Sequence, residues 1–185
     1  MNLSTSTQWQ ANARVVRSPN FDMRPEGVLV DLIVIHAISL PPGSYGGSGI
    51  EQLFTNQLDP DAHPYYAQIA GLKVSSHFLI RRDGELVQFV PVAARAWHAG
   101  QSQWQGRERC NDFSIGIELE GDDDTPFETA QYETLQSLLV GLAKDWPIRA
   151  ITSHAFIAPV RKTDPGPHFD WDWVRQVCPQ LDIAP

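Results

Sequence analysis

The sequence has few cysteines, little charge and no long hydrophobic run in its 185 residues. Its two cysteines, Cys110 and Cys178, are too few for a disulfide framework and are typical of a reducing cytoplasm; one bridge between them is the alternative. The first thirty residues contain no basic segment followed by an apolar stretch, and no run is long enough to cross a bilayer. We therefore expect a cytoplasmic protein with no signal peptide and no membrane partner.

Basic residues are also scarce, and the net charge is −8. A nucleic-acid surface needs a basic footprint, so we expect no nucleic-acid partner. Between positions 73 and 109 the balance is reversed, with six basic residues against three acidic ones: Lys73, Arg81, Arg82, Arg95, Arg107 and Arg109 are the six. This region either holds a small anionic ligand by focused charge or carries scattered, solvated charges, and composition leaves both open.

The first half of the chain predicts strands around a long loop. Leu29–His36 is an apolar, β-branched run, typical of a buried central strand. Residues 41–73 are rich in Gly and Pro and contain one predicted short helix, at 50–58; a loop this long is usually functional. Residues 78–89 predict a hairpin whose turn, Asp83-Gly84, favours type I′.

Two further strands are predicted in the second half. Residues 113–120 alternate between apolar side chains and small or polar ones. On the polar side Gly116 leaves open space beside Glu118, which suggests a cleft. Residues 148–152 form a short final strand that delivers His154 to the following loop.

Helices complete the pattern. Residues 132–144 have apolar side chains at helical spacing, and this helix is expected to begin with a capping box at Thr125 or with Thr129 as its cap. A terminal helix is expected to start at Asp170. Because strands and helices intermix, we predict an α/β fold with a central mixed β-sheet flanked by helices. We expect one domain, residues 1–185, whose core spans about 15–175.

Three residues are candidates for a metal site. His36 closes the first predicted strand, His154 follows the last one, and Asp164 lies ten residues further on, before a stiff Pro-Gly-Pro turn. Strand ends are where side chains can converge while the sheet holds them rigid. Two imidazoles and one carboxylate are the protein ligands of a hydrolytic zinc site, whose fourth position stays open for water.

Other histidines are alternative candidates for a metal ligand. His63 and His168 stand beside prolines in loops and fit hydrogen-bonded structural roles. His77 begins a predicted strand and is the strongest rival ligand. Spacing alone therefore makes the triad of His36, His154 and Asp164 a weak prediction.

Four motifs in order strengthen it, and with them the chain resembles the AmpD family of zinc-dependent N-acetylmuramoyl-L-alanine amidases, of the type 2 amidase superfamily. The resemblance covers roughly Val15 to Val174. The motifs are Val34-Ile-His-Ala-Ile-Ser-Leu-Pro-Pro-Gly43, Arg95-Ala-Trp-His-Ala-Gly100, Gly106-Arg-Glu-Arg-Cys-Asn-Asp-Phe-Ser-Ile-Gly-Ile-Glu-Leu-Glu-Gly121 and Ile157-Ala-Pro-Val-Arg-Lys-Thr-Asp-Pro-Gly166. The resemblance implies a peptidoglycan-recognition-like architecture.

The resemblance also implies an activity. The enzyme would recycle cell-wall fragments in the cytoplasm, cleaving the amide between the lactyl group of 1,6-anhydro-N-acetylmuramic acid and L-Ala of soluble anhydro-muropeptides. One Zn²⁺ per chain would be held by His36, His154 and Asp164. The catalytic pair would be Glu118, which passes a proton from water to the leaving amine, and Lys162, which faces the oxyanion.

Substrate-binding residues are also expected, in a chain that we expect to be a monomer. Trp97 and His98 are predicted to line the groove, although core packing is the alternative for Trp97. Arg109 suits a carboxylate of the stem peptide, and Lys73 adds a point charge.

The chain departs from the family pattern at two places. Ala37 replaces an Asn that often follows the first ligand. Ser153-His154-Ala155-Phe156 replaces a common Gly-His-x-Asp. These changes affect the surroundings of the ligands rather than the ligands.

Three other functions remain as alternatives. The chain could be an amidase acting on intact peptidoglycan outside the cytoplasm, or a muropeptide-binding protein that has lost hydrolysis. Zinc as a purely structural ion would require a fourth protein ligand, for which no Cys or His is well placed.

Overall fold

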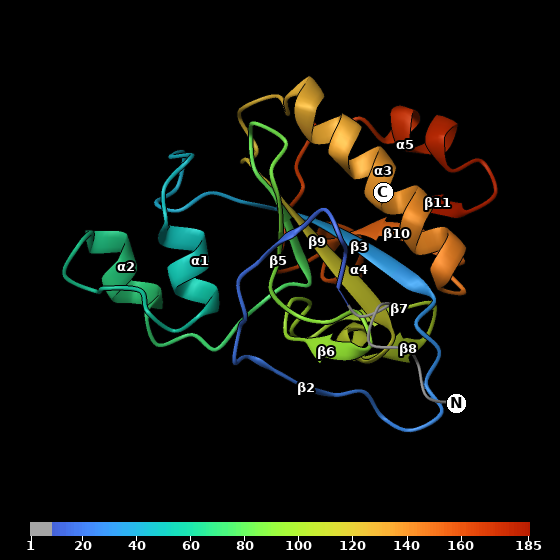
Figure 1. Ribbon diagram of the computed structural model, residues 1–185, viewed down its shortest axis with the longest axis horizontal. Helices are drawn as coiled ribbons and strands as arrows, with labels where there is room; N and C mark the ends of the chain where they lie inside the picture. Colours follow the sequence, from blue (N-terminus) through green and yellow to red (C-terminus); the bar gives the residue numbers. More distant parts are fainter. Residues whose placement is uncertain (1–8) are drawn as a thin grey trace.

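A seven-stranded sheet crosses the centre of the computed structural model, which describes residues 9–185 (Figure 1). The first eight residues, which enter the signal-peptide prediction, lie outside the described residues. The strand order is β1-β5-β4-β9-β3-β10-β11. Their bounds are β1 Arg14–Val15, β3 Leu32–Ile38, β4 Phe78–Ile80, β5 Leu86–Gln88, β9 Ser114–Glu120, β10 Ala150–Ser153 and β11 Asp182–Ala184. The β4–β5 pair is antiparallel and the other pairs are parallel, so the predicted mixed sheet is confirmed.

Helices and short hairpins surround this sheet. The helices are α1 Gly49–Phe54, α2 Pro64–Ile69, α3 Thr129–Asp145, α4 His154–Ile157 and α5 Trp171–Val177. Smaller elements are the pair β2 Phe21–Met23 and β6 Ala94–Ala96, the pair β7 Gln103–Trp104 and β8 Arg107–Glu108, and a 3-10 turn at Cys110–Asp112. In Figure 1, α3 and α5 lie together on one side, whereas α1 and α2 project beyond the β5 end.

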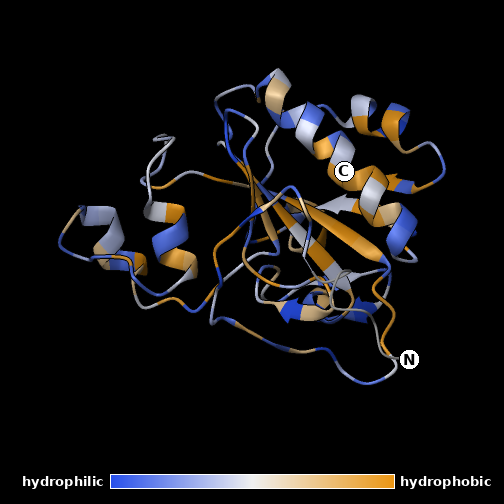
Figure 2. Cartoon of the chain, in the orientation of Figure 1, coloured by the Kyte–Doolittle hydropathy of each residue, from blue (hydrophilic) through white to orange (hydrophobic). Residues whose placement is uncertain are grey.

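The two faces of the central strands bury different side chains. Ile33, Ile35, Ile115 and Ile117 pack against α3 and α5, and their strands form the apolar centre of Figure 2. The opposite face of β3 and β9 carries the other alternate residues and is covered by the segment 97–113. Because both faces are covered, Leu32 to His36 is buried without interruption, as predicted. The predicted start at Leu29 is wrong, because Leu29 is 58% exposed and β3 begins at Leu32. However, β3 continues to Ile38, so His36 lies inside the strand and does not end it.

The predicted type I′ turn is wrong. Gly84 has a φ of +85°, but Asp83 is not among the residues with positive φ, which type I′ requires at both central positions. The Gly84 N–H donates to the carbonyl of Arg81 at 2.9 Å, and the Asp83 carboxylate accepts from the N–H of Glu85 at 3.0 Å. The aspartate side chain closes the turn locally, so only glycine needs the left-handed conformation.

The predicted start of the long helix is also wrong. Glu128 occupies the cap position of α3, in place of Thr125 or Thr129. Its N–H donates to Oε1 of Gln131 at 3.0 Å, and the buried Gln131 amide also donates to backbone carbonyls of β4 and β9. Because Gln131 is bound to the sheet and also accepts from the N–H of Glu128, the helix begins directly after Glu128. The helix from Asp170 was predicted correctly, with Asp170 as its cap, whereas α2 and β11 were not predicted.

The basic stretch does not form an unpaired patch. Five of its six side chains bind carboxylates: Arg81 pairs with Glu51 and Glu120, Arg82 with Glu128, Arg95 with Asp22 and Asp112, Arg107 with Asp31, and Arg109 with Asp112. The charges are therefore scattered, as in the second alternative, but carboxylates compensate five of them and Arg81 is buried instead of solvated. Cys110 and Cys178 are both free thiols, and no helix within residues 9–185 is long and apolar enough to span a membrane.

Candidate active site

Two strands and one helix start deliver the catalytic candidates to one end of the sheet. His36 on β3 is the register partner of Glu118 on β9, and both lie on the face opposite α3. His154 is the first residue of α4, directly after β10. The Ser153 hydroxyl accepts from the N–H of Phe156 at 2.9 Å and so caps this helix. The parallel pairing of β3 with both neighbours therefore brings these side chains together.

Asp164 returns to the same place through a short loop. The backbone N–H of Ala155 donates to the carbonyl of Asp164 at 2.9 Å, which ties the loop to the start of α4. The N–H of Gly166 donates to the carbonyl of Thr163 at 3.0 Å, and Gly166 has a φ of +83°. This turn, which only glycine adopts without strain, aims the carboxylate back at the histidines.

The three predicted metal ligands converge. Nδ1 of His36 lies 2.9 Å from Nδ1 of His154 and 3.2 Å from Oδ2 of Asp164, and His154 Nδ1 lies 3.0 Å from the same oxygen. A tetrahedral zinc ion with ligands at 2.0–2.1 Å separates its ligand atoms by about 3.3 Å. The donor set and the spacing therefore fit zinc after an outward movement of a few tenths of an ångström. No other group of this kind occurs among residues 9–185.

The surroundings keep these groups in the forms that bind metal. Burial lowers the pKa of His36 to about 4, so its imidazole is neutral at physiological pH. Burial acts to raise the pKa of Asp164, but its close contacts with the imidazoles of His154 and His36 outweigh burial and lower the pKa well below its usual range. A neutral imidazole and an ionised carboxylate are the states needed for ligation.

A cavity of about 600 Å³ opens onto the three ligands. Glu118, Lys162 and Trp97 line the same cavity. Burial raises the pKa of Glu118 well above its usual value; the charge of Asp164 raises it further, and the charge of Lys162 opposes this. A carboxylate with a raised pKa, next to a water-accessible metal site, can accept a proton near neutral pH.

The open space predicted at Gly116 is occupied. A Cβ atom at this position would lie 2.5 Å from Cγ of His98, so the glycine accommodates the His98 ring instead of opening a cleft. His98 lines the cavity, but both ring nitrogens have protein partners: Nδ1 lies 2.9 Å from Nε2 of His36, and Nε2 lies 3.2 Å from the Ser114 hydroxyl.

The rival histidines have structural roles. Nδ1 of His77 accepts the N–H of Gly116 at 3.0 Å and Nε2 donates to the carbonyl of Ala94 at 3.1 Å, so neither nitrogen is available to a metal. Nδ1 of His63 accepts from the N–H of Tyr65 and caps α2. His168 is exposed and outside the metal cluster.

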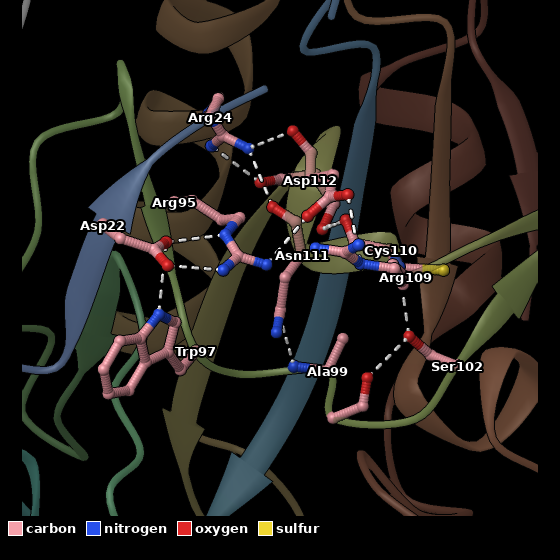
Figure 3. Close-up of polar contacts among 12 residues, drawn as sticks. Asp22, Arg24, Arg95, Trp97, Ala99, Ser102, Arg109, Cys110, Asn111 and Asp112 are labelled. Carbon is pink, nitrogen blue, oxygen red and sulfur yellow. Dashed lines mark hydrogen bonds and ion pairs between the residues drawn. The ribbon is translucent and has the colours of Figure 1, made fainter. Parts of the chain in front are cut away.

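The predicted substrate-binding residues are dispersed. Trp97 lines the main cavity, and its indole donates to Asp22 at 3.3 Å (Figure 3). Arg109 lines a second cavity of about 410 Å³, with a φ of +59° and an ion pair to Asp112. Lys73 is exposed and does not line the main cavity, although Leu72 and Val74 do.

The two departures from the family pattern lie in different places. Ala37 lines the main cavity next to His36. Phe156 is 51% exposed, lines the second cavity and packs against Trp104, with 5.5 Å between ring centroids. Ala37 therefore lies at the edge of the candidate site, but its side chain packs on the α3 face of the sheet, opposite His36.

Sequence analysis missed Asn111, which organises the loop beside the site. Its Oδ1 accepts the backbone N–H groups of His98 at 3.1 Å and Ala99 at 2.8 Å; the second bond is drawn in Figure 3. Arg24, also missed, donates to the carbonyls of Asn111 and Asp112. Hydropathy does not mark such residues, because their partners are backbone groups distant in sequence.

Known proteins are similar to this chain in sequence and in fold. Residues 25–167 match the family described as N-acetylmuramoyl-L-alanine amidase. The 1,6-anhydro-N-acetylmuramyl-L-alanine amidase AmpD of Enterobacter cloacae is 59% identical over 165 residues, 88% of each chain. A crystal structure of an AmpD derivative superposes with a TM-score of 0.88 at 55% identity, covering 91% of this chain and 96% of that one.

A more distant neighbour holds a ligand. Amidase AmiD of Escherichia coli, solved with anhydro-N-acetylmuramic acid-L-Ala-D-gamma-Glu-L-Lys, is 31% identical with a TM-score of 0.59, covering 86% of this chain and 61% of that one. The predicted type 2 amidase architecture is thus confirmed. On the family match and the identity to AmpD, the chain belongs to the N-acetylmuramoyl-L-alanine amidase family.

Proposed function

We propose that this protein hydrolyses the amide between the lactyl group of 1,6-anhydro-N-acetylmuramic acid and L-alanine of muropeptides. The observation that carries the proposal is the convergence of His36, His154 and Asp164 on a cavity that Glu118 and Lys162 also line. The relatives named for this amide bond support the choice of substrate.

The metal site is proposed to hold one zinc ion through Nδ1 of both histidines and a carboxylate oxygen of Asp164. Bound there, zinc supplies Lewis acidity to the attacking water and to the scissile carbonyl. Side chains of the protein carry out proton transfer and stabilise the oxyanion.

Glu118 is the proposed proton carrier. Its raised pKa suits it to accept the proton of the attacking water and to release that proton to the leaving amine of L-alanine. Lys162 lies two residues before Asp164 and lines the same cavity, so its ammonium group can face the oxyanion of the tetrahedral intermediate.

Recognition is proposed to begin at Trp97, whose ring is half-buried on the cavity wall and suits packing against a sugar or peptide plane. Arg109 and Lys73 are proposed to reach charged groups of the stem peptide outside the cavity. We infer that the protein acts as a cytoplasmic monomer on soluble fragments.

Mass spectrometry of the products from a defined anhydro-muropeptide, with and without a chelator, tests the proposal. We expect free L-Ala-containing peptide and anhydro-N-acetylmuramic acid in equal amounts, and no products with the chelator. Faster cleavage of polymeric peptidoglycan than of the fragment would favour an amidase that acts on the wall. Binding of the fragment without cleavage in the zinc-loaded protein would leave only a binding function.

A further inference from the structure

The segment 97–100 contacts both histidine ligands on the side of each ring that is remote from the proposed metal site. Nε2 of His36 lies 2.9 Å from Nδ1 of His98, and Nε2 of His154 lies 3.3 Å from the carbonyl oxygen of Ala99. These are the ring nitrogens that do not face the cluster of ligand atoms. Two adjacent residues of one loop therefore meet the outer nitrogens of the two imidazoles.

The hydrogen bonds behind His36 can run in only one direction. Three hydrogen bonds follow one another. The first joins His36 to His98, the second joins His98 to the Ser114 hydroxyl at 3.2 Å, and the third joins that hydroxyl to the carbonyl of Cys110 at 2.6 Å. A carbonyl oxygen only accepts, so Ser114 donates to Cys110 and its oxygen accepts from His98 Nε2. A neutral His98 with its proton on Nε2 has a bare Nδ1, which accepts from His36 Nε2–H.

This direction selects the metal-binding form of His36. With its proton on Nε2, the imidazole has an unprotonated Nδ1, and that nitrogen faces His154 and Asp164. The rings of His36 and His98 meet edge to face, 89° apart, so the shared hydrogen bond also fixes the rotation of His36.

The position of His98 is itself tightly determined. Its ring lies against Gly116, where any Cβ atom would clash, and its backbone N–H is held by the side chain of Asn111. Only 9% of His98 is exposed. The ring cannot turn toward the cavity without breaking bonds on two sides.

We propose that His98 is a positioning residue for the metal site: its Nδ1 accepts the Nε2 proton of His36 and so fixes the tautomer and orientation in which His36 binds the ion. The proposal rests on the proposed metal site, but it makes no use of the substrate. In this role His98 acts through His36 and does not touch the reacting atoms.

Nitrogen-15 NMR of the histidine rings in the unaltered, zinc-loaded protein tests the direction of these hydrogen bonds. We expect His98 to carry its proton on Nε2 and to have a bare Nδ1. A proton on Nδ1 of His98 would reverse the hydrogen bond and overturn the proposal. This measurement needs no substitution, so it stands even if a variant fails to fold.

Zinc affinity, measured by competition with a chelator, tests the energetic role. His98→Leu removes the acceptor, and partners of metal ligands typically contribute about 10- to 100-fold in metal affinity, so we expect a loss of that size. His98→Asn places Oδ1 near the position of Nδ1, keeps an acceptor for His36, and should restore most of the affinity. Equal losses in both variants would show that His98 only fills space, and unchanged affinity in His98→Leu would also reject the proposal.

Amidase turnover in the same samples separates this proposal from the proposed function. If the unaltered zinc-loaded protein cleaves no muropeptide while His98→Leu still loses zinc selectively, the proposed function fails and the positioning role stands. If turnover is normal and zinc affinity does not change in the His98 variants, the proposed function stands and the positioning role fails.

Discussion

The cavity has a floor and a rim that differ in how they are held. The floor, defined as His36, Glu118, His154 and Asp164, lies on paired strands or is tied to a helix start, and its members are mostly buried. The rim residues predicted to bind substrate, Lys73, Trp97 and Arg109, come from loops and short edge elements. The Arg109 side chain is 68% exposed and already paired with Asp112.

This difference separates chemistry from recognition. Floor residues are held by register and by hydrogen bonds to backbone groups, so their geometry exists before substrate arrives. Rim residues can move to follow a ligand. We therefore expect floor substitutions to lower kcat, rim substitutions to raise KM, and the floor effects to be much larger.

Glu118→Gln should give the largest loss of turnover among the variants that keep all three proposed metal ligands. It keeps the shape but removes the proton carrier, so we expect kcat to fall about 10²- to 10⁴-fold with zinc content unchanged. Loss of zinc from this variant would mark Glu118 as a ligand and would contradict the proposed role.

The same variant has a signature in stability. The pKa of Glu118 is raised in the folded state, so the folded protein retains a proton that the unfolded chain releases. The free energy of unfolding therefore falls as pH rises from the pKa of the unfolded chain to that of the folded protein. Glutamine cannot ionise, so metal-free Glu118→Gln should have a higher Tm than metal-free wild type at pH 7. The two should unfold at nearly the same temperature at pH 4, where both side chains are uncharged.

Floor residues were also the more predictable from sequence. His36 lies on a continuous apolar strand and Glu118 on a strand with clear alternation, and a parallel pairing suffices to put them side by side. The location of His98 was not predictable, because Gly116 looks like open space until the ring that fills it is known. The ion pairs of Arg81 and Arg95 likewise join segments far apart in the chain, so the basic stretch gave a false impression of a patch.

Lys162→Ala should have the next largest effect. Loss of a positive group facing the oxyanion typically lowers kcat about 10²- to 10³-fold, and zinc content should stay near that of wild type. Lys144→Ala, which removes the same charge from the last turn of α3, is the matched control and should have normal kinetics. Normal turnover in Lys162→Ala would remove this lysine from the mechanism.

Trp97→Leu sharpens the comparison at the rim. If the indole packs on substrate, KM should rise about tenfold, the effect of roughly 1.4 kcal/mol of lost contact, with kcat within a factor of about two. Steady-state kinetics on a soluble anhydro-muropeptide measure both constants. A fall in kcat with unchanged KM would mean that Trp97 supports the floor through the adjacent His98, and the division drawn here would fail at this residue.

Arg109→Ala tests how far the rim extends. Because Arg109 lines the second cavity and not the one that contains the ligands, we expect a KM increase of at most a few-fold, about the size of one exposed ion pair. The effect should shrink as salt rises, since exposed charges are screened. A larger loss that is independent of salt would show that Arg109 leaves Asp112 and enters the site with substrate.

Ala37→Asn should have the smallest effect and is the most informative about the border between floor and rim. Ala37 lines the edge of the main cavity on β3, directly after His36, and its side chain packs on the α3 face, so an amide there can offer hydrogen bonds to substrate only from the cavity edge. We expect KM to fall modestly, with zinc affinity unchanged. Phe156→Asp, which changes the other departure, places a negative charge in the cavity that Arg109 lines, so any change in KM that it causes should shrink as salt rises. A change in zinc affinity in Ala37→Asn would place residue 37 with the floor, because only a shift of His36 could transmit it.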